Sequence, residues 1–198
     1  MSNEKSCAIL LNSPEAFPPV TEDFVIAADG GAHSGVRIDL WVGDGDSGNA
    51  PQGVEKILVA PEKDETDGEL ALSEAIRLGF QTVRFYGVTG GRIDQQLGNL
   101  SLIADATKKG LSAEGVSNGL KIRYCEGKVS FHTKIGTVFS ILAFFGDVLV
   151  KDAKGVKYPL NPLKLSPYAM GRGMSNEAME EEVSFVVERG GVLLFIYE

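Results

Sequence analysis

Five short segments in the first 90 residues are mostly apolar, and each is followed by a turn that contains glycine or an acidic residue. The segments are residues 7–11, 24–28, 40–42, 57–59 and 82–86. A strand with water on one face alternates apolar and polar residues, whereas a strand covered on both faces is apolar along its whole length. These segments therefore predict the strands of a mostly parallel sheet that is covered on both sides.

Two helical segments are expected between and after these strands. Thr66 and Glu69 have the spacing of a capping box, in which side chains at a helix start satisfy unpaired backbone amides. Gly79 is a typical stop signal for this helix. A second helix is expected over residues 94–109, with one buried face formed by Ile93, Leu97, Leu100 and Ala104. Alternation of strands and helices is typical of an open α/β sheet.

The pattern of the chain changes after about residue 118. Short β-rich segments follow one another at residues 121–125, 128–132, 137–145, 148–151, 182–187 and 192–197. Turn signals separate most of them, and no long helical pattern intervenes. We therefore expect an α/β protein with two domains. Residues 1–115 would form the open, mostly parallel α/β domain, and residues 116–198 a small antiparallel β-sandwich.

Charge and composition exclude several classes of function. The chain has 19 basic and 27 acidic residues and a net charge of −8, so it has no general electrostatic attraction to nucleic acid or to anionic membranes. No segment approaches the 18 apolar residues of a transmembrane helix, and the first residues lack the apolar core of a signal peptide. We expect a cytoplasmic protein without nucleic-acid or membrane partners. Cys7 and Cys125 lie apart in apolar segments, which predicts buried thiols.

Acidic residues gather in four turns at strand ends or helix starts. The turns are Asp29-Gly30-Gly31, Asp44-Gly45-Asp46, the segment from Lys63 and Asp64 to Thr66 and Asp67, and Gly90-Gly91-Arg92-Ile93-Asp94. In an open α/β sheet, ligands bind beyond the carboxyl ends of the strands. Each turn taken alone is also an ordinary loop or helix start. Their conjunction at one sheet edge favours a single site.

Such a site has the chemistry of phosphate binding. Two carboxylates about 4 Å apart repel each other by roughly 4 kcal/mol at an effective dielectric constant near 20. A Mg²⁺ ion removes this repulsion, because it binds oxygen atoms from carboxylates and substrate phosphates together. Glycine amides, the helix starts at Thr66 and Asp94, and the cations Arg92 and Lys63 add donors and positive charge. This set predicts transfer of a phosphoryl-type group.

In this order, the four turns resemble the motifs of the thiamine pyrophosphokinase (thiamine diphosphokinase) family. The third motif continues to Leu72, and the fourth continues to Leu97 and Asn99. A weaker match lies in Ser175-Asn176-Glu177 and in the final strand around Phe195. The resemblance therefore covers most of the chain.

The resemblance implies an α/β catalytic domain, a β-sandwich, and a homodimer that binds thiamine between subunits. It implies Mg²⁺ ligands at Asp44, Asp46, Asp64, Asp67 and Asp94. It implies ATP contacts at Asp29, Gly30, Gly31, Lys63, Asp64, Thr66, Gly90, Gly91, Gln95 and Asn99. Ser175 and Asn176 match positions that approach thiamine, and Phe195 matches a position where an aromatic ring can stack on its pyrimidine.

Two positions depart from the family pattern. Gln95 stands where a histidine commonly follows the aspartate of the fourth motif, so an essential imidazole is not expected there. Gly45 replaces a bulkier residue within the second motif. Neither change removes an expected metal ligand.

The expected reaction is transfer of the pyrophosphoryl group of ATP to the hydroxyl of thiamine, which gives thiamine diphosphate and AMP. The expected catalytic residues are Asp44, Asp46, Asp67, Arg92 and Asp94. Asp46 or Asp67 would orient or deprotonate the hydroxyl. Three alternatives use the same acidic turns: transfer to another heterocycle such as a hydroxymethylpterin, hydrolysis of a nucleotide to AMP and pyrophosphate, and a nucleotide or thiamine sensor without catalysis.

Overall fold

The computed structural model describes residues 5–46, 48–60, 62 and 64–198. The chain forms two compact units, Met1–Asn118 and Gly119–Glu198. Each has its own strands and its own apolar core. The expected residue Lys63 lies outside the described part of the chain.

The first unit contains a parallel sheet, as the apolar segments predict. Its strands are β1 (Ser6–Leu10), β2 (Phe24–Ala28), β3 (Leu40–Gly43), β4 (Glu55–Leu58), β5 (Thr82–Tyr86) and β6 (Ser112–Ser117). Their order is β6-β5-β1-β2-β3-β4, and all neighbours run parallel. The chain moves outward from β1 to β4 and then returns to the other side of β1 with β5. Such a reversal places the ligand crevice beyond the carboxyl ends of β1 and its neighbours.

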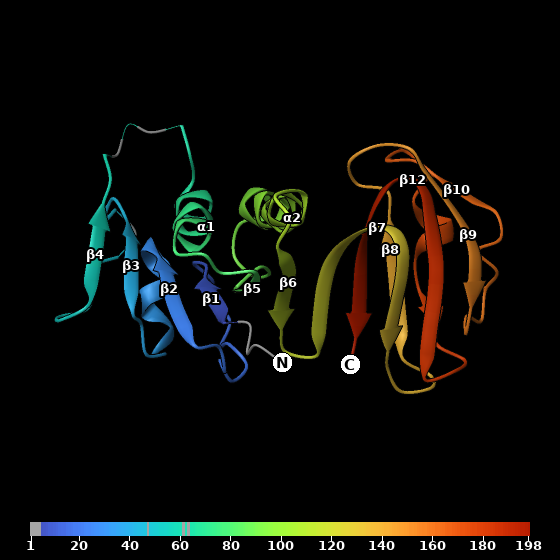
Figure 1. Ribbon diagram of the computed structural model, residues 1–198, viewed down its shortest axis with the longest axis horizontal. Coiled ribbons are helices and arrows are strands. Elements are labelled where there is room, and N and C mark those ends of the chain that lie inside the picture. Colours follow the sequence, from blue (N-terminus) through green and yellow to red (C-terminus); the bar gives the residue numbers. More distant parts are fainter. Residues whose placement is uncertain (1–4, 47, 61, 63) are drawn as a thin grey trace. The chain divides into compact units, whose positions relative to one another are not determined.

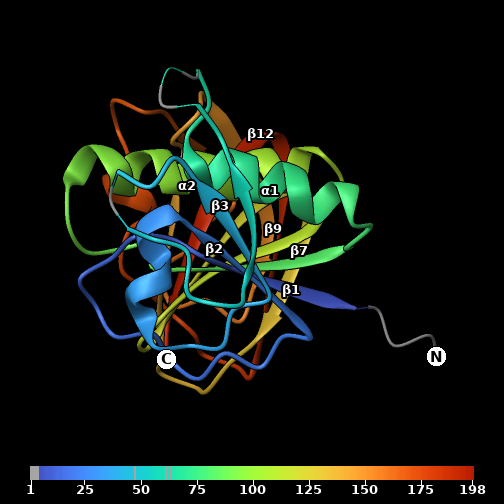
Figure 2. The same ribbon diagram turned by 90° about the vertical axis from the view of Figure 1, so that its left-hand side faces the viewer.

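Helices cover one face of this sheet, and loops cover the other. Helix α1 (Asp67–Arg77) and helix α2 (Ile93–Lys108) lie side by side on the same side of the strands (Figures 1 and 2). On the opposite face, Phe17 and Val20 from the loop after β1 pack against strand residues including Leu10 and Trp41. Figure 2 shows the short helix η1 (Asp29–Ser34) on this second side.

The expected buried face of α2 is wrong in its first half. Ile93 is 69% exposed and Leu97 is 45% exposed, whereas Leu102, Ile103 and Ala106 are buried. The reason is that only the second half of α2 lies on the sheet, so apolar periodicity near the helix start does not report burial. The helix begins at Ile93 with Arg92 as N-cap, one residue before the expected start.

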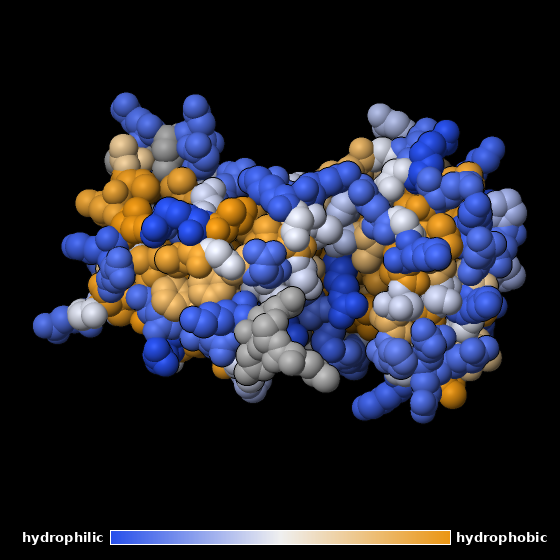
Figure 3. Space-filling view, viewed as in Figure 1, coloured by the Kyte–Doolittle hydropathy of each residue, from blue (hydrophilic) through white to orange (hydrophobic). Residues whose placement is uncertain are grey.

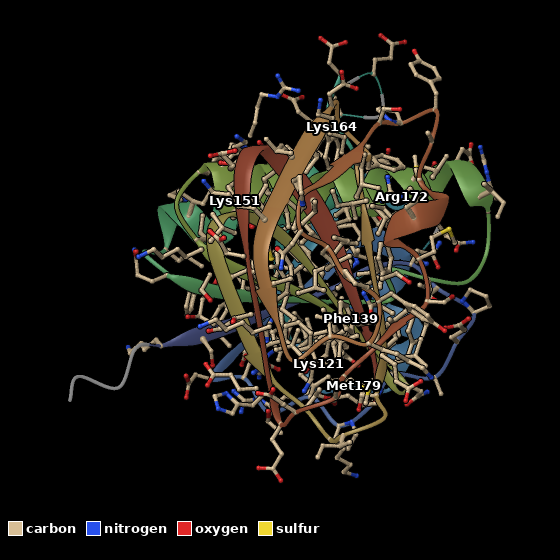
Figure 4. All side chains as sticks on the ribbon, turned by 90° about the vertical axis from the view of Figure 1, so that its right-hand side faces the viewer. Lys121, Phe139, Lys151, Lys164, Arg172 and Met179 are labelled. Carbon is tan, nitrogen blue, oxygen red and sulfur yellow. The ribbon has the colours of Figure 1, made fainter. Side chains whose placement is uncertain are left out.

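The second unit consists of antiparallel strands. They are β7 (Leu120–His132), β8 (Val138–Leu142), β9 (Val148–Lys154), β10 (Leu163–Leu165), β11 (Asn176–Glu177) and β12 (Glu182–Tyr197). Strand β12 pairs with β7, β8 and β9. Figure 4 shows Phe139 inside this unit, where it is fully buried, and Lys164 at its outside.

Two expected turns of the second unit lie within continuous strands instead. Residues 121–125 and 128–132 both belong to β7, and residues 182–187 and 192–197 both belong to β12. The pairing register of β12 shifts between Val187 and Val192. A β-carbon on Gly191 would lie 2.0 Å from the hydroxyl oxygen of Tyr124. Gly190 and Gly191 therefore lie in a bulge that makes room for the Tyr124 ring, and the strand continues through this bulge.

Both cysteine thiols are free, and the buried character expected for them is confirmed for Cys7, which has no exposed surface. Burial raises the pKa of the Cys7 thiol to about 12 and that of Cys125 to about 11.

Hydrophobic residues reach the surface over β3 and β4 (Figure 3), where Leu58 of the edge strand is 67% exposed. Neither helix in the described part of the chain is long and apolar enough to cross a lipid bilayer.

Candidate active site

A pocket of about 560 Å³ lies in the first unit at the carboxyl edge of the sheet. The start of α1, the first three turns of α2 and the residues after β1 and β2 form its wall. Of the expected site residues, the wall includes Asp29, Gly30, Thr66, Asp67, Asp94, Gln95 and Asn99. Three of the four acidic turns therefore contribute to one cavity, as expected from their positions at strand ends and helix starts.

Three carboxylates meet at this edge of the sheet. Oxygen atoms of Asp29, Asp44 and Asp67 all lie within 4.8 Å of one another. They come from the end of β2, the end of β3 and the first residue of α1. Asp29 is 2% exposed, and the other two are partly exposed. This all-oxygen donor set fits Mg²⁺, and a bound cation would offset the mutual repulsion of the three charges.

The position of Asp29 depends on a special backbone conformation. Its φ is 38°, in the left-handed region that residues other than glycine rarely adopt. Its carbonyl oxygen accepts a hydrogen bond from Trp41 Nε1 at 3.2 Å, and its Oδ1 accepts one from the amide of Gly45 at 3.2 Å. A β-carbon on Gly43 would lie 2.8 Å from that of Asp29. Glycine at residue 43 therefore makes room for the buried aspartate.

The second acidic turn is folded around Asp44. Its Oδ1 accepts a hydrogen bond from the amide of Asp46 at 3.0 Å, which is the geometry of an Asx turn. Asp46 and Asp64 are exposed. Within residues 5–46, 48–60, 62 and 64–198, the close carboxylate group does not include Asp46, Asp64 or Asp94.

The predicted capping box places Asp67. Thr66 is the N-cap of α1, and its Oγ1 accepts a hydrogen bond from the amide of Glu69 at 3.2 Å. The Glu69 carboxylate accepts one from the amide of Thr66 at 2.7 Å. These reciprocal bonds fix the first turn, so Asp67 lies at the positive end of the helix dipole.

In the fourth turn, Arg92 and Asp94 pair with each other. Arg92 Nε donates to Asp94 Oδ1 at 3.1 Å, and Arg92 Nη2 donates to Asp94 Oδ2 at 2.5 Å. Both side chains are mostly exposed. These bonds hold the pKa of the Asp94 carboxyl below its ordinary value. Gly90 and Gly91 have φ of 86° and 69°. A β-carbon on Gly90 would lie 2.9 Å from Ser13 Oγ, so the turn is packed against the loop after β1.

Asn99 acts on the same turn from inside α2. Its Nδ2 donates to the carbonyl oxygen of Val88 at 3.3 Å. Ser13 Oγ donates to the carbonyl oxygen of Thr89 at 2.8 Å. The loop after β5 is thus held by α2 on one side and by the loop after β1 on the other, which positions Asn99 as a support for the fourth turn.

The motifs missed several residues of the pocket wall. Asn12, Gly98, Ser101 and Asp105 belong to it. Asn12 follows β1, the strand at the chain reversal, and the rule that located the acidic turns could have located it. The three α2 residues have no motif of their own, because their place in the wall follows from how α2 lies beside α1.

The expected thiamine residues lie in the second unit. Ser175 is exposed, with φ of 55°, and its amide donates to Ser140 Oγ at 3.0 Å. Phe195 is partly buried in β12 and lies opposite Ser140 of β8. Asn176 is 2% exposed, and its side chain bonds both the amide and the carbonyl of Tyr158, at 3.0 and 2.9 Å. Ser175 and Phe195 therefore share Ser140 as a neighbour, and Asn176 holds the Tyr158 segment.

Comparison with known proteins identifies relatives for these features. Residues 20–114 match the family model described as thiamin pyrophosphokinase, catalytic domain. The thiamine pyrophosphokinase of Bacillus subtilis (strain 168) is 27% identical over 137 residues, a match that spans 67% of this chain but only 63% of that curated relative.

Solved structures of similar fold cover nearly the whole chain. The crystal structure of thiamine pyrophosphokinase from Bacillus subtilis has a TM-score of 0.85 at 23% identity and covers 98% of this chain and 99% of its own. Thiamin pyrophosphokinase from Candida albicans has a TM-score of 0.81 at 15% identity, over 98% of this chain and 89% of its own. These likenesses show a shared mixed α/β fold. Together with the match of residues 20–114, they confirm the resemblance to the thiamine pyrophosphokinase family that the four acidic turns indicate.

Proposed function

We propose that this chain is a thiamine diphosphokinase, an enzyme that transfers the pyrophosphoryl group of ATP to the hydroxyl of thiamine and releases AMP. The observation that carries the proposal is the close group of Asp29, Asp44 and Asp67, of which Asp29 and Asp67 line a pocket beside the start of α1. The family match of residues 20–114 covers all three carboxylates.

Asp29, Asp44 and Asp67 would hold a Mg²⁺ ion, because they offer only oxygen ligands at a spacing that one cation can bridge. When bound, the ion neutralises charge on the phosphates. We propose that metal ions bound to the incoming ATP would be coordinated by the three other expected ligands, Asp46, Asp64 and Asp94. Asp29 is an addition to the ligands expected from the motifs, which assigned it to the nucleotide only.

The chain's own groups would bind and orient the phosphates. The start of α1 lies at the pocket wall, and its helix dipole favours negative charge there. The thiamine hydroxyl oxygen attacks the β-phosphorus, the bond from that phosphorus to the α-phosphate oxygen breaks, and AMP leaves. A carboxylate, Asp46 or Asp67, takes the hydroxyl proton. Arg92, which pairs with the pocket residue Asp94, would add positive charge at the fourth turn.

We further propose separate roles for the two parts of the chain. Residues 1–115 would bind Mg²⁺ and ATP, and residues 116–198 would form a β-sandwich that binds thiamine and joins two subunits as a homodimer. Ser175 and Phe195 would contact thiamine near Ser140. Asn176 would act through the Tyr158 backbone that it holds.

The test is AMP release from Mg²⁺-ATP with and without thiamine, with mass detection of thiamine diphosphate. Thiamine-dependent AMP and the diphosphate product support the proposal. AMP release that requires a hydroxymethylpterin contradicts the acceptor but keeps the site. AMP and pyrophosphate without an acceptor indicate a hydrolase, and tight nucleotide binding without turnover indicates a sensor.

A further inference from the structure

Gly98 is an unusual residue in its place, because it lies in the interior of α2, between Leu97 and Asn99. A glycine in a helix interior costs about 0.5–1 kcal/mol relative to alanine, so its presence calls for a packing or a binding reason. Among the described residues, a β-carbon on Gly98 would have no atom within 4 Å outside its own turn and its chain neighbours. Packing therefore gives no reason for glycine at this position.

Gly68 of α1 provides the contrast. A β-carbon there would lie 2.9 Å from a methyl carbon of Leu102 and 3.1 Å from one of Leu11. Gly68 is thus needed where the two helices touch. Gly98 lies on the same pocket wall, yet it faces open space.

The open space beside Gly98 belongs to a groove along α2. Gln95, Gly98, Leu102 and Asp105 all line the pocket, and their spacing of three and four residues places them on one face of the helix. That face runs for about 15 Å at 1.5 Å per residue. The contact between Gly68 and Leu102 supplies an apolar part of the pocket wall.

The two ends of this pocket differ in charge chemistry. Asp29 and Asp67, which form the close carboxylate group with Asp44, line one end and suit a cation with polyphosphate. At the other end, Asp105 pairs with Lys109 at 2.7 Å, and the Ser101 hydroxyl donates to the carbonyl oxygen of Leu97 at 3.3 Å, which leaves its oxygen as an acceptor. In the described part of the chain, Asp105 belongs to no close carboxylate group, so this end lacks a set of ligands for a cation with phosphates, and its oxygens can accept hydrogen bonds from neutral hydroxyl groups.

We infer that Gly98 keeps one wall of the pocket clear so that the nucleoside of the substrate nucleotide lies along α2, with its ring over Leu102 and its sugar hydroxyls toward Ser101 and Asp105. The inference rests on the proposed function, because it takes the polyphosphate to be at the carboxylate group. It makes Gly98 a residue that determines which ligand fits, at a cost in helix stability.

The experiment compares Gly98→Ala and Gly98→Leu with the unaltered protein and with Ser73→Leu. Ser73 is an exposed mid-helix residue of α1 outside the pocket wall, so the same added side chain tests for general effects. Calorimetry measures binding of α,β-methylene-ATP, tripolyphosphate and thiamine, each with Mg²⁺. The first probe cannot break at the α–β position, and the second has no nucleoside. Thermal unfolding measures Tm.

We expect Gly98→Leu to weaken α,β-methylene-ATP binding by about tenfold or more while tripolyphosphate binds as before. Ser73→Leu should leave both affinities unchanged. Gly98→Ala should raise Tm by about 1–4 °C and weaken the nucleotide analogue by a smaller factor. If Gly98→Leu does not fold, the alanine variant still tests the opposite changes in stability and affinity.

Three results overturn the inference: equal analogue binding by Gly98→Leu, an equal loss of tripolyphosphate binding, or a loss confined to thiamine. Failure of the unaltered protein to bind the analogue overturns it as well. Failure of the proposed function is a separate result. In that case the unaltered protein binds the analogue but releases no AMP with thiamine, and the variants still decide the role of Gly98.

Discussion

Asp44 shares its site with two other carboxylates whose oxygens lie within 4.8 Å. Changing Asp44 to Asn keeps an oxygen that can accept the amide of Asp46 but removes one negative charge. We expect AMP release to fall at least about 100-fold, because a charged ligand of the proposed Mg²⁺ ion, which would neutralise the reacting phosphates, is lost. Without Mg²⁺, the variant should unfold at the same Tm or higher, since repulsion is relieved.

An AMP-release assay measures the expected loss of turnover, and thermal unfolding with and without Mg²⁺ measures the expected change in Tm. Asp147→Asn is the matched control, because Asp147 is an exposed carboxylate of the second unit. A full Mg²⁺-induced rise in Tm in Asp44→Asn, together with normal turnover, would show that the carboxylate group is not the metal site.

The cysteine thiols predict a loss of stability in alkaline solution. The pKa of Cys7 rises from 9.0 to about 12, mainly because burial disfavours the thiolate, and that of Cys125 rises from 9.0 to about 11. Above pH 9 the unfolded chain loses these protons while the folded chain keeps them, so the free energy of unfolding falls as pH rises toward 11 and 12. The slope is about 1.4 kcal/mol per pH unit for each thiol. Urea unfolding between pH 8 and 11 should show a shallower decline for Cys7→Ala, and an equal decline contradicts the assignment.

At the scale of single residues, the sequence predicted which turns carry the carboxylates but not which three carboxylates lie close together. Two strand ends and a helix start placed Asp29, Asp44 and Asp67 at one edge, as the structure confirms. The left-handed backbone of Asp29, which turns its carboxylate into the group, follows from the packing of Gly43 and Trp41 and has no sequence signature. For the same reason, the motifs could not separate Asp44 from Asp46, two residues farther along an exposed loop.

Helix α1 begins with a complete capping box, so the contribution of its first turn to stability can be measured by substitution. Thr66→Ala removes the hydroxyl that accepts the Glu69 amide. We expect the free energy of unfolding to fall by about 0.5–2 kcal/mol and Tm by about 2–4 °C for each kcal/mol. Thr66→Ser keeps the hydroxyl and should restore both values. Equal Tm for the alanine and serine variants would contradict a capping role.

Glu22 joins the segment before β2 to strand β5. Its side chain is 1% exposed and accepts hydrogen bonds from Arg84 at 2.8 Å and from the hydroxyl of Tyr86 at 2.9 Å. Glu22→Gln should lower the free energy of unfolding by about 1–3 kcal/mol, at the lower end because Arg84 is 42% exposed to solvent. Urea unfolding of this variant, of Arg84→Met and of the double variant gives the coupling. Additive effects contradict a direct pair.

The accuracy of the sequence prediction at the scale of elements follows from burial. Strands β1, β2, β3 and β5 are mostly apolar and mostly buried, and they were recognised. Strand β6 was missed because its sequence, SAEGVS, is small and polar, although β5 pairs with it throughout. The first half of α2 was assigned to the core because periodicity cannot show where a helix leaves the sheet.

For the whole molecule, the proposed roles of the two parts predict where a nucleotide protects the chain. Every residue of the pocket wall lies in Met1–Asn118. Mg²⁺ with α,β-methylene-ATP should therefore slow amide hydrogen exchange around residues 28–30, 66–69 and 94–105 and leave most of residues 119–198 unchanged. Added thiamine should extend protection to residues 175–176 and 195. Protection of residues 119–198 by the nucleotide alone would contradict the division of roles.

Strand β12 also sets an order of events during synthesis of the chain. It pairs with β7, β8 and β9, yet residues 182–197 leave the ribosome after all three of these partners. The first unit can complete its parallel sheet while the second still lacks the strand that its neighbours share. Nascent chains arrested before residue 182 should therefore expose the edges of β7 and β9, and they become the form that chaperones and proteases meet first.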